Sequence, residues 1–341
     1  MSSSANQASP ALRGALFHLG ILGVAVVTAA VVWTRDKQPK SIAAGDVTVW
    51  SGRQADVERI GYENKTKTIA LSVHKDEVGR YFVGSIEKSA PAPASSASAG
   101  APPPAPKTTT TIVSVAAADK LADALAPLKA LRALGKIGDD RASEFGLAEP
   151  DATVSVKIGA SERKLLLGGP TPGSGDRYVK DPTSGEVFAV RGEPFRTLES
   201  ADTTMVERDL HEWKDTEVQT ATLTAGSKSR AIVRGGVEGK RFWADAASPE
   251  TNDETLGNWM SKLDRLRPTE FLAEPPAEKQ AVLRIEYAGG KSLGFIELSR
   301  TPAGDNGKPT YLIRTERTRL YAKVPLPAAE PVEQDLGAVV K

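Results

Sequence analysis

The longest hydrophobic stretch of the chain lies near its start. Residues 15–33 form an apolar run that contains no Asp, Glu, Lys or Arg. At about 1.5 Å of rise per residue, a helix of this length approaches the roughly 30 Å of hydrocarbon in a bilayer. Trp33 stands at its far end, where an amphipathic ring suits the headgroup layer. The pattern predicts an uncleaved transmembrane helix over 15–33, preceded by a short tail over 1–14, because the run is too long for a signal peptide.

Beyond this segment, the same order of hydrophobic patterns occurs twice. A strand-like stretch leads to Arg80–Val83 in the first copy and to Arg241–Ala244 in the second. Apolar residues at helical spacing follow, which places them on one face of a helix that can cover a sheet. We therefore expect these side chains in the core and not around a cofactor. The matched positions are Leu121, Leu125, Leu128 and Leu131 in the first copy, and Leu256, Met260, Leu263 and Leu266 in the second.

Each predicted helical region is followed by the same tetrapeptide, Leu-Ala-Glu-Pro. The proline restricts the residue before it, which ends the helical region. Alternating apolar residues then predict strands, with Leu165 and Leu167 of the first copy matched to Leu293 and Phe295 of the second. Each copy is predicted to run β-β-β-α-β-β-β-β.

The repeat predicts the domain organisation. Antiparallel strands joined by short turns, with one covering helix, indicate an α+β class: a transmembrane helix followed by two tandem β-rich modules. A Pro-, Ala- and Ser-rich insertion at 89–107 occurs in the first copy alone and is predicted to be a disordered loop, because it cannot bury a core. After the anchor, the predicted parts are module one at 45–190, a connector at 191–210 that is helical over Pro194–Leu210, module two at 211–326 and a flexible tail at 327–341.

Composition narrows the function. The 44 Lys and Arg residues balance 43 Asp and Glu residues, so no strong field favours nucleic acid, which we do not expect as a partner. Cysteine is absent, which removes disulfides, thiolate nucleophiles and cysteine metal sites. Only three histidines occur, and none has a partner at metal-binding spacing. The sequence predicts no metal and no cofactor.

The sequence also lacks a recognisable catalytic motif. Residues 168–175 are glycine-rich, but two prolines remove amide donors and no Gly-Lys-Ser/Thr ending follows, so a hairpin loop is favoured over a phosphate site. The acidic pair Asp253 and Glu254 falls at the start of a predicted helix, where capping explains it better than acid–base catalysis. We therefore expect a protein that is not an enzyme, with a carboxylate hydrolase as the least favoured alternative.

Tryptophans are the remaining candidates for a binding site, since their rings can stack on sugars. Trp243 falls at the matched aromatic position of the repeat, which favours core packing. Trp259 is matched to Ala124 of the first copy and is therefore predicted to be partly exposed. Trp259 and Trp213 are the two residues that we expect to contact a ligand or partner.

The sequence also resembles a known family. The residues that carry this resemblance are Phe145–Leu147 with Pro150, the stretch Leu165–Gly168, Tyr178-Val179 and Val187–Val190. They resemble a bacterial family catalogued as domain-of-unknown-function family 4340, over about 47–326. The resemblance implies an accessory partner of ABC-type exporters of the gliding-motility kind, anchored in the inner membrane. It implies no catalytic residues.

The orientation of the anchor bears on the function. Arg35, Lys37 and Lys40 follow the apolar run, which by the positive-inside rule would keep the following domain in the cytoplasm. Long domains, however, translocate largely regardless of flanking charge, so we favour a periplasmic C-terminal part. The leading hypothesis is a non-enzymatic, membrane-anchored accessory or scaffold protein of the cell envelope, plausibly a partner of an ABC-type export complex. The alternative is an envelope glycan- or peptide-binding module.

Overall fold

The computed structural model of the chain describes residues 47–89, 107–237, 239–302 and 307–340. The predicted transmembrane segment at 15–33 lies outside these ranges. Within them, no helix is long and apolar enough to cross a membrane.

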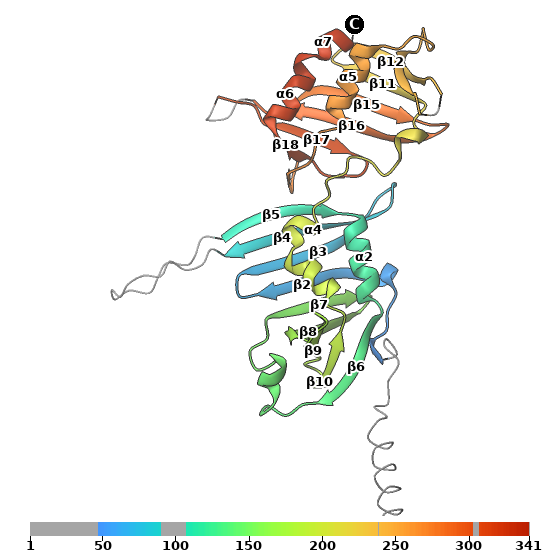
Figure 1. Cartoon of the computed structure of the whole chain (residues 1–341). Coiled ribbons are helices and arrows are strands. Elements are labelled where there is room, and N and C mark those ends of the chain that lie inside the picture. The colour runs from blue at the N-terminus through green and yellow to red at the C-terminus, as the bar shows by residue number, and fades with distance from the viewer. Residues whose placement is uncertain (1–46, 90–106, 238, 303–306, 341) are drawn as a thin grey trace, which may run out of the picture.

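The first half of the described chain, residues 47–205, is built on ten antiparallel strands (Figure 1). The pairings run in the order β1, β6, β10, β9, β8, β7, β2, β3, β4 and β5. Its strands are β1 (Val47–Trp50), β2 (Val57–Asn64), β3 (Lys67–Lys75), β4 (Arg80–Ser89), β5 (Lys107–Ser114), β6 (Leu128–Lys136), β7 (Ala152–Ile158), β8 (Ser161–Pro170), β9 (Arg177–Lys180) and β10 (Glu186–Val190). Its helices are η1 (Gln54–Asp56), α2 (Ala116–Leu125), η2 (Ala142–Phe145), α3 (Glu193–Glu199) and α4 (Ala201–Thr204).

The second half, residues 210–340, has eight strands that are also antiparallel. Here the pairings run β14, β18, β17, β16, β15, β11, β12 and β13. Its strands are β11 (Thr220–Ala225), β12 (Lys228–Gly235), β13 (Phe242–Asp245), β14 (Glu270–Phe271), β15 (Gln280–Ala288), β16 (Ser292–Arg300), β17 (Tyr311–Thr315) and β18 (Ala322–Val324). Its helices are η3 (Asp215–Glu217), α5 (Glu254–Leu263), α6 (Leu326–Gln334) and α7 (Leu336–Val339).

One strand pairing joins the halves. Thr111 of β5 pairs with Phe271 of β14, so the described strands form one continuous sheet. The junction is reinforced by the Arg319 guanidinium, whose Nε lies 2.8 Å from an Asp76 carboxyl oxygen in the turn between β3 and β4. The observed architecture is therefore mostly antiparallel sheet with few helices, which confirms the predicted α+β class.

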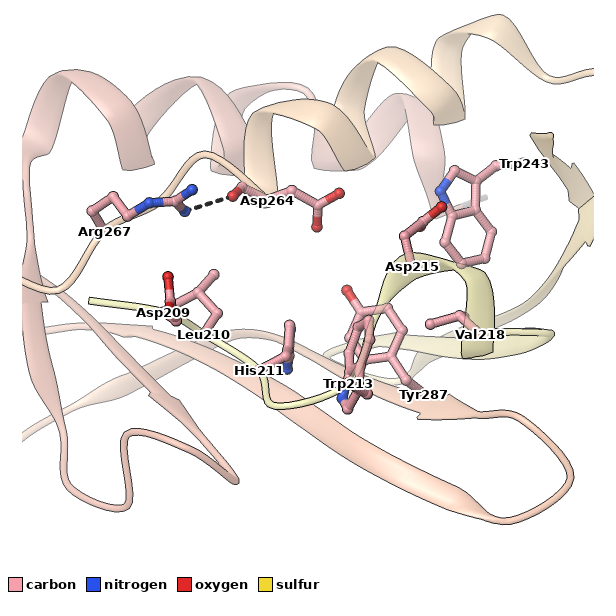
Figure 2. Close-up of a pocket in the computed structure, with 10 residues that line it drawn as sticks. All are labelled: Asp209, Leu210, His211, Trp213, Asp215, Val218, Trp243, Asp264, Arg267 and Tyr287. Atoms are coloured by element: carbon pink, nitrogen blue, oxygen red, sulfur yellow. Dashed lines mark hydrogen bonds between the residues drawn. The ribbon is translucent and has the colours of Figure 1, made fainter. Parts of the chain in front are cut away.

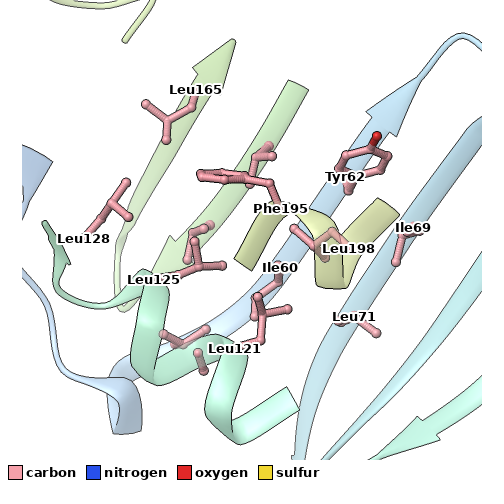
Figure 3. Close-up of a cluster of buried hydrophobic side chains, with 14 of the residues drawn as sticks. Ile60, Tyr62, Ile69, Leu71, Leu121, Leu125, Leu128, Leu165, Phe195 and Leu198 are labelled. Carbon is pink, nitrogen blue, oxygen red and sulfur yellow. The ribbon is translucent and has the colours of Figure 1, made fainter. Parts of the chain in front are cut away.

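The core of each half lies between the sheet and its helices. In the first half, α2 and α3 place leucines and Phe195 over buried residues of β2 and β3, such as Ile60 and Leu71 (Figure 3). Full burial of each such side chain contributes about 1.5–3 kcal/mol. The α5 helix buries Leu256, Trp259, Met260 and Leu263 over the second half in the same way.

The predicted helix in the first copy is too long. It ends at Leu125, and Leu128 and Leu131 belong to strand β6. The buried positions of α2 are the third, sixth, seventh and tenth residues of the helix, and those of α5 are the same four. Trp259 therefore corresponds to Leu121 and not to Ala124. The pairing was wrong by about one turn, because a shift of three or four residues leaves the same face of a helix apolar.

The strand match after the helix is wrong in register. Leu165 and Leu167 are buried in β8, but Leu293 and Phe295 are only partly buried in β16. The buried side chains of β16 include Ile296 and Leu298 instead. Successive side chains of a strand point to opposite faces, so an error of an odd number of residues, here the three from Leu293 to Ile296, exchanges the two faces.

Two connecting segments also differ from expectation. Ser89 and Lys107 are paired residues of β4 and β5, so the insertion at 89–107 begins and ends in the sheet; residues 90–106 lie outside the described ranges. The predicted helical connector, Pro194–Leu210, is helical only as far as Thr204. Its helices α3 and α4 pack on the core of the first half through Phe195, Leu198 and Ala201, which fixes them there.

The C-terminal segment 327–341 was predicted to be a flexible tail, and this is wrong for the part that the structure describes. Helices α6 and α7 occupy most of it, and Val332 and Val339 are fully buried. The indole Nε1 of Trp259 donates a 2.8 Å hydrogen bond to the carbonyl oxygen of Val332. The segment is ordered because its apolar residues complete the core over α5.

We predict that Trp259→Phe destabilises the protein by about 2–4 kcal/mol, because it leaves a cavity and an unpaired carbonyl at Val332. Urea unfolding followed by circular dichroism measures the change. Trp213→Phe is the matched control. Trp213 is only half-buried and its indole nitrogen has no partner among the described residues, so the loss should be smaller. Equal losses in the two variants would contradict this account.

Candidate functional site

A pocket of about 220 Å³ opens in the second half of the chain (Figure 2). One side is the segment from Asp209 to Val218, which enters the half before β11. The opposite side is the C-terminal end of α5 with Asp264, and Tyr287 of β15 lies on the sheet below. The pocket is small for a drug-sized ligand, which usually needs about 300–1,000 Å³, so it suits a small group.

The entering segment is held by polar contacts to the sheet. The Glu316 carboxylate accepts a 2.9 Å hydrogen bond from the Phe295 amide, and its other oxygen lies 2.8 Å from Nδ1 of His211. The Lys214 amide donates to the Glu217 carboxylate at 2.8 Å, which closes the short helix η3. These contacts fix the backbone on both sides of Trp213.

Aromatic rings form one wall of the pocket. The rings of His211 and Trp213 stack with centroids 4.0 Å apart and planes at 24°. The ring centroid of Tyr287 lies 4.8 Å from that of Trp213 and 5.2 Å from that of His211. The Arg234 guanidinium lies over the Trp243 ring, 4.4 Å from its centroid. One face of Trp213 and one face of Trp243 are thus already occupied.

The cations around the pocket already have partners. Arg234 forms an ion pair with Asp215. Arg267 donates 2.7 Å hydrogen bonds to the carbonyl oxygens of Asp264 and Leu266. The Asp264 carboxyl, in contrast, has no hydrogen bond or ion pair to another described residue, although the surrounding charges influence its pKa.

Asp264 is placed unfavourably in two respects. It caps the C-terminal end of α5, where the helix dipole disfavours negative charge. The residue as a whole is exposed, but its carboxyl faces the protein around the pocket, and this partial desolvation raises the pKa of the group above its ordinary value. His211, Arg234 and Arg267 lower the pKa by smaller amounts. A carboxylate held in this way is typical of functional sites.

Tyr287 is the second unusual group. The residue is only 2 % exposed, and its hydroxyl has no hydrogen-bond partner in the described structure. Burial, followed by the charges of Asp264 and Glu316, raises the pKa of Tyr287 well above its ordinary value. In Figure 2 its hydroxyl and the Asp264 carboxyl point into the same space. The pocket therefore contains a neutral hydroxyl and a carboxyl that can both accept hydrogen bonds.

The two tryptophans predicted to contact a ligand are not brought together. Trp213 lines the pocket, which is where a residue that contacts a ligand has to lie. Trp259 does not: it is 2 % exposed in the core, so the expected partial exposure is wrong. The error follows from the one-turn slip of the helix match. Trp243 is buried, as expected for core packing. Asp253 is the N-cap of α5 and accepts from the Leu256 amide, which confirms its capping role.

Sequence reasoning missed His211, Asp264 and Tyr287 as members of one site. His211 and Tyr287 carry no local signal, because their contacts come from distant segments. Asp264 does carry one, since an acidic residue just beyond a helix C-terminus opposes the usual charge preference. Among the described residues, no group of three or more His, Cys, Asp or Glu could hold a metal ion.

The fold and the pocket define an α+β protein with an antiparallel sheet and a small site walled by aromatic and acidic residues. Residues 113–284, half of the chain, match the family model described as a domain of unknown function, DUF4340. The chain belongs to this family, which confirms the resemblance. The match includes His211, Trp213 and Asp264 of the pocket. No curated protein and no solved structure matches the chain.

We predict that Asp264→Asn stabilises the protein at pH 7. The folded-state pKa of Asp264 is raised, so the folded chain binds this proton more tightly than the unfolded chain does. The cost in stability therefore appears as pH rises from the ordinary pKa of 3.8 through the raised folded-state pKa. Below pH 3.8 the cost vanishes, because the carboxyl is protonated in both states.

Urea midpoints of the two proteins at pH 7 and pH 3 measure this effect. The variant should have the higher midpoint at pH 7, and the difference should shrink at pH 3. The control is Glu278→Gln, which neutralises an exposed carboxylate outside the pocket and should change neither midpoint much. A lower midpoint for Asp264→Asn at pH 7 would refute the assignment.

Proposed function

We propose that the protein is a non-enzymatic, membrane-anchored accessory or scaffold protein of the bacterial cell envelope, built from two tandem copies of one β-rich module. Support for the duplication comes from the strand order. In both halves, the first strand after the covering helix pairs with the last strand of that half. From the last strand, the pairings run back through the earlier strands to those that precede the helix. The covering helices α2 and α5 bury the same four positions.

The observation that carries the scaffold role is the continuity of the sheet across both copies. Pairing of Thr111 with Phe271 and the contact of Arg319 with Asp76 tie the second copy to the edge of the first. A backbone hydrogen bond of 2.7 Å from the Glu207 amide to the Val113 carbonyl adds a third tie. Because these contacts fix the two copies relative to each other, they present one long rigid surface. Such a surface suits a scaffold that holds a partner protein in a fixed place.

The proposed place in the cell rests on sequence. The apolar run 15–33 supplies a single anchor of membrane-spanning length, and the domain behind it is proposed to lie in the periplasm. The proposed partners are subunits of an ABC-type export or gliding-motility-like complex, as the family resemblance implies.

The second candidate, an envelope glycan- or peptide-binding module, is favoured by the pocket beside Trp213. The aromatic contacts argue for the peptide and against the glycan. Sugar rings stack on an open aromatic face, whereas His211 covers one face of Trp213 and Arg234 covers one face of Trp243.

We predict that a reporter active only outside the cytoplasm is active when fused after Lys341. The corresponding reporter that is active only in the cytoplasm should be silent at the same position. Enzyme activity of both fusions in intact cells, normalised to fusion protein in the membrane fraction, gives the answer. The reverse pattern would replace the envelope role by that of a cytoplasmic scaffold tethered at its N-terminus.

We also predict that ABC-type transporter subunits co-purify with the full chain from detergent-solubilised membranes. The control is an unrelated single-pass protein that carries the same tag at the same expression level. Quantitative mass spectrometry should show the transporter subunits enriched several-fold over this control. Equal recovery with both baits would argue against the partnership and leave the peptide-binding candidate.

A further inference from the structure

The pocket of the second half has one negative charge without a partner. Of its charged members, Asp215 is paired with Arg234, and Arg267 is engaged by carbonyl oxygens. Asp209 is highly exposed and lies 4.0 Å from Arg317. Asp264 alone points its carboxyl into the pocket without a hydrogen bond or ion pair to a described residue (Figure 2). A bound cation would supply what this carboxylate lacks.

Two further acceptors belong to the same pocket. The Tyr287 hydroxyl is buried and has no partner among the described residues. Nε2 of His211 is also buried without one. With Nδ1 of His211 bonded to Glu316, Nε2 is an acceptor when the ring is neutral and a donor when the ring is protonated. A ligand that brings several N–H donors would satisfy these atoms.

The walls of the pocket suit a short alkyl chain that ends in a positive charge. Trp213, Trp243 and Tyr287 supply apolar surface for methylene groups. Aromatic rings also attract cations, although one face of Trp243 is already used by Arg234. The volume of about 220 Å³ admits one such side chain but not an extended oligomer.

We propose that this pocket binds a primary ammonium group at the end of an alkyl chain, as in a lysine side chain of a peptide, with Asp264 as its counter-ion and Tyr287 as a hydrogen-bond partner. An ammonium has three donors and no acceptor, which matches the unpaired oxygens of Asp264 and Tyr287. An anionic ligand would meet Asp264 and Asp215, and Arg267, the arginine that lines the pocket, already donates to two carbonyl oxygens. The inference does not depend on the proposed membrane anchor or on an ABC-type partner.

The direct test titrates the purified full chain with Nα-acetyl-lysine methylamide. The matched probe is Nα-acetyl-norleucine methylamide, which keeps the alkyl chain and lacks the ammonium. Tryptophan fluorescence reports on the pocket, because Trp213 and Trp243 line it, and calorimetry gives the affinity. The lysine derivative should produce a saturable change at pH 7, and the norleucine derivative should bind at least about tenfold more weakly, the value of one lost charge-assisted contact. Equal binding of the two probes, or binding of neither, overturns the proposal.

Two variants locate the binding. Asp264→Asn should weaken the lysine derivative at least about tenfold, while Tyr287→Phe should weaken it by a smaller factor. Since Asp264→Asn is expected to be more stable than the parent chain, a loss of affinity cannot be ascribed to unfolding. The Glu278→Gln control should leave the affinity unchanged. Unchanged affinity in Asp264→Asn overturns the assignment of the counter-ion.

Discussion

The structure depends on a strand that is paired on both sides. Strand β5 is bonded to β4 along its length and meets β14 of the second half at Thr111. Sheet edges expose unpaired amide and carbonyl groups that invite pairing with other chains. The pairing of Thr111 with Phe271 connects the edge strand of one half to the edge strand of the other. β5 is therefore the strand through which the two halves form one sheet.

A similar covering helix lies on the sheet in both halves, but the surroundings of its C-terminal end differ. In both, a ten-residue helix lays an apolar stripe on the sheet. In the second half, however, the residue just beyond this helix is Asp264, and the incoming segment carries His211 and Trp213 across from it. The pocket arises because a strand end, a helix end and a connecting segment meet there. Substitution of an exposed residue at that meeting point, such as Asp264, can therefore change the site while the core residues stay in place.

Much of the architecture could be predicted from the sequence, because alternation and helical periodicity report directly on burial. The positions of Leu121 and Leu256 in covering helices illustrate this. The failures have physical reasons. A helical stripe tolerates a slip of one turn, so Trp259 was matched to the wrong residue. Strand β6 was missed because Leu128 and Leu131 also fit the helical spacing. The site as a whole could not be predicted. Trp213 was a candidate and Asp264 carries a local signal, but Tyr287 acquires its character from neighbours distant in sequence.

The docking of α6 on Trp259 has a consequence for the order in which the protein can form. All buried residues of the first core precede Val206, so this core can assemble once that part of the chain is free to fold. The second core includes Val332 and Val339, which follow all eight strands of that half. Until they emerge, the indole of Trp259 has no carbonyl partner and the apolar face of α5 stays uncovered. The later half is thus the more exposed to chaperones and proteases during synthesis.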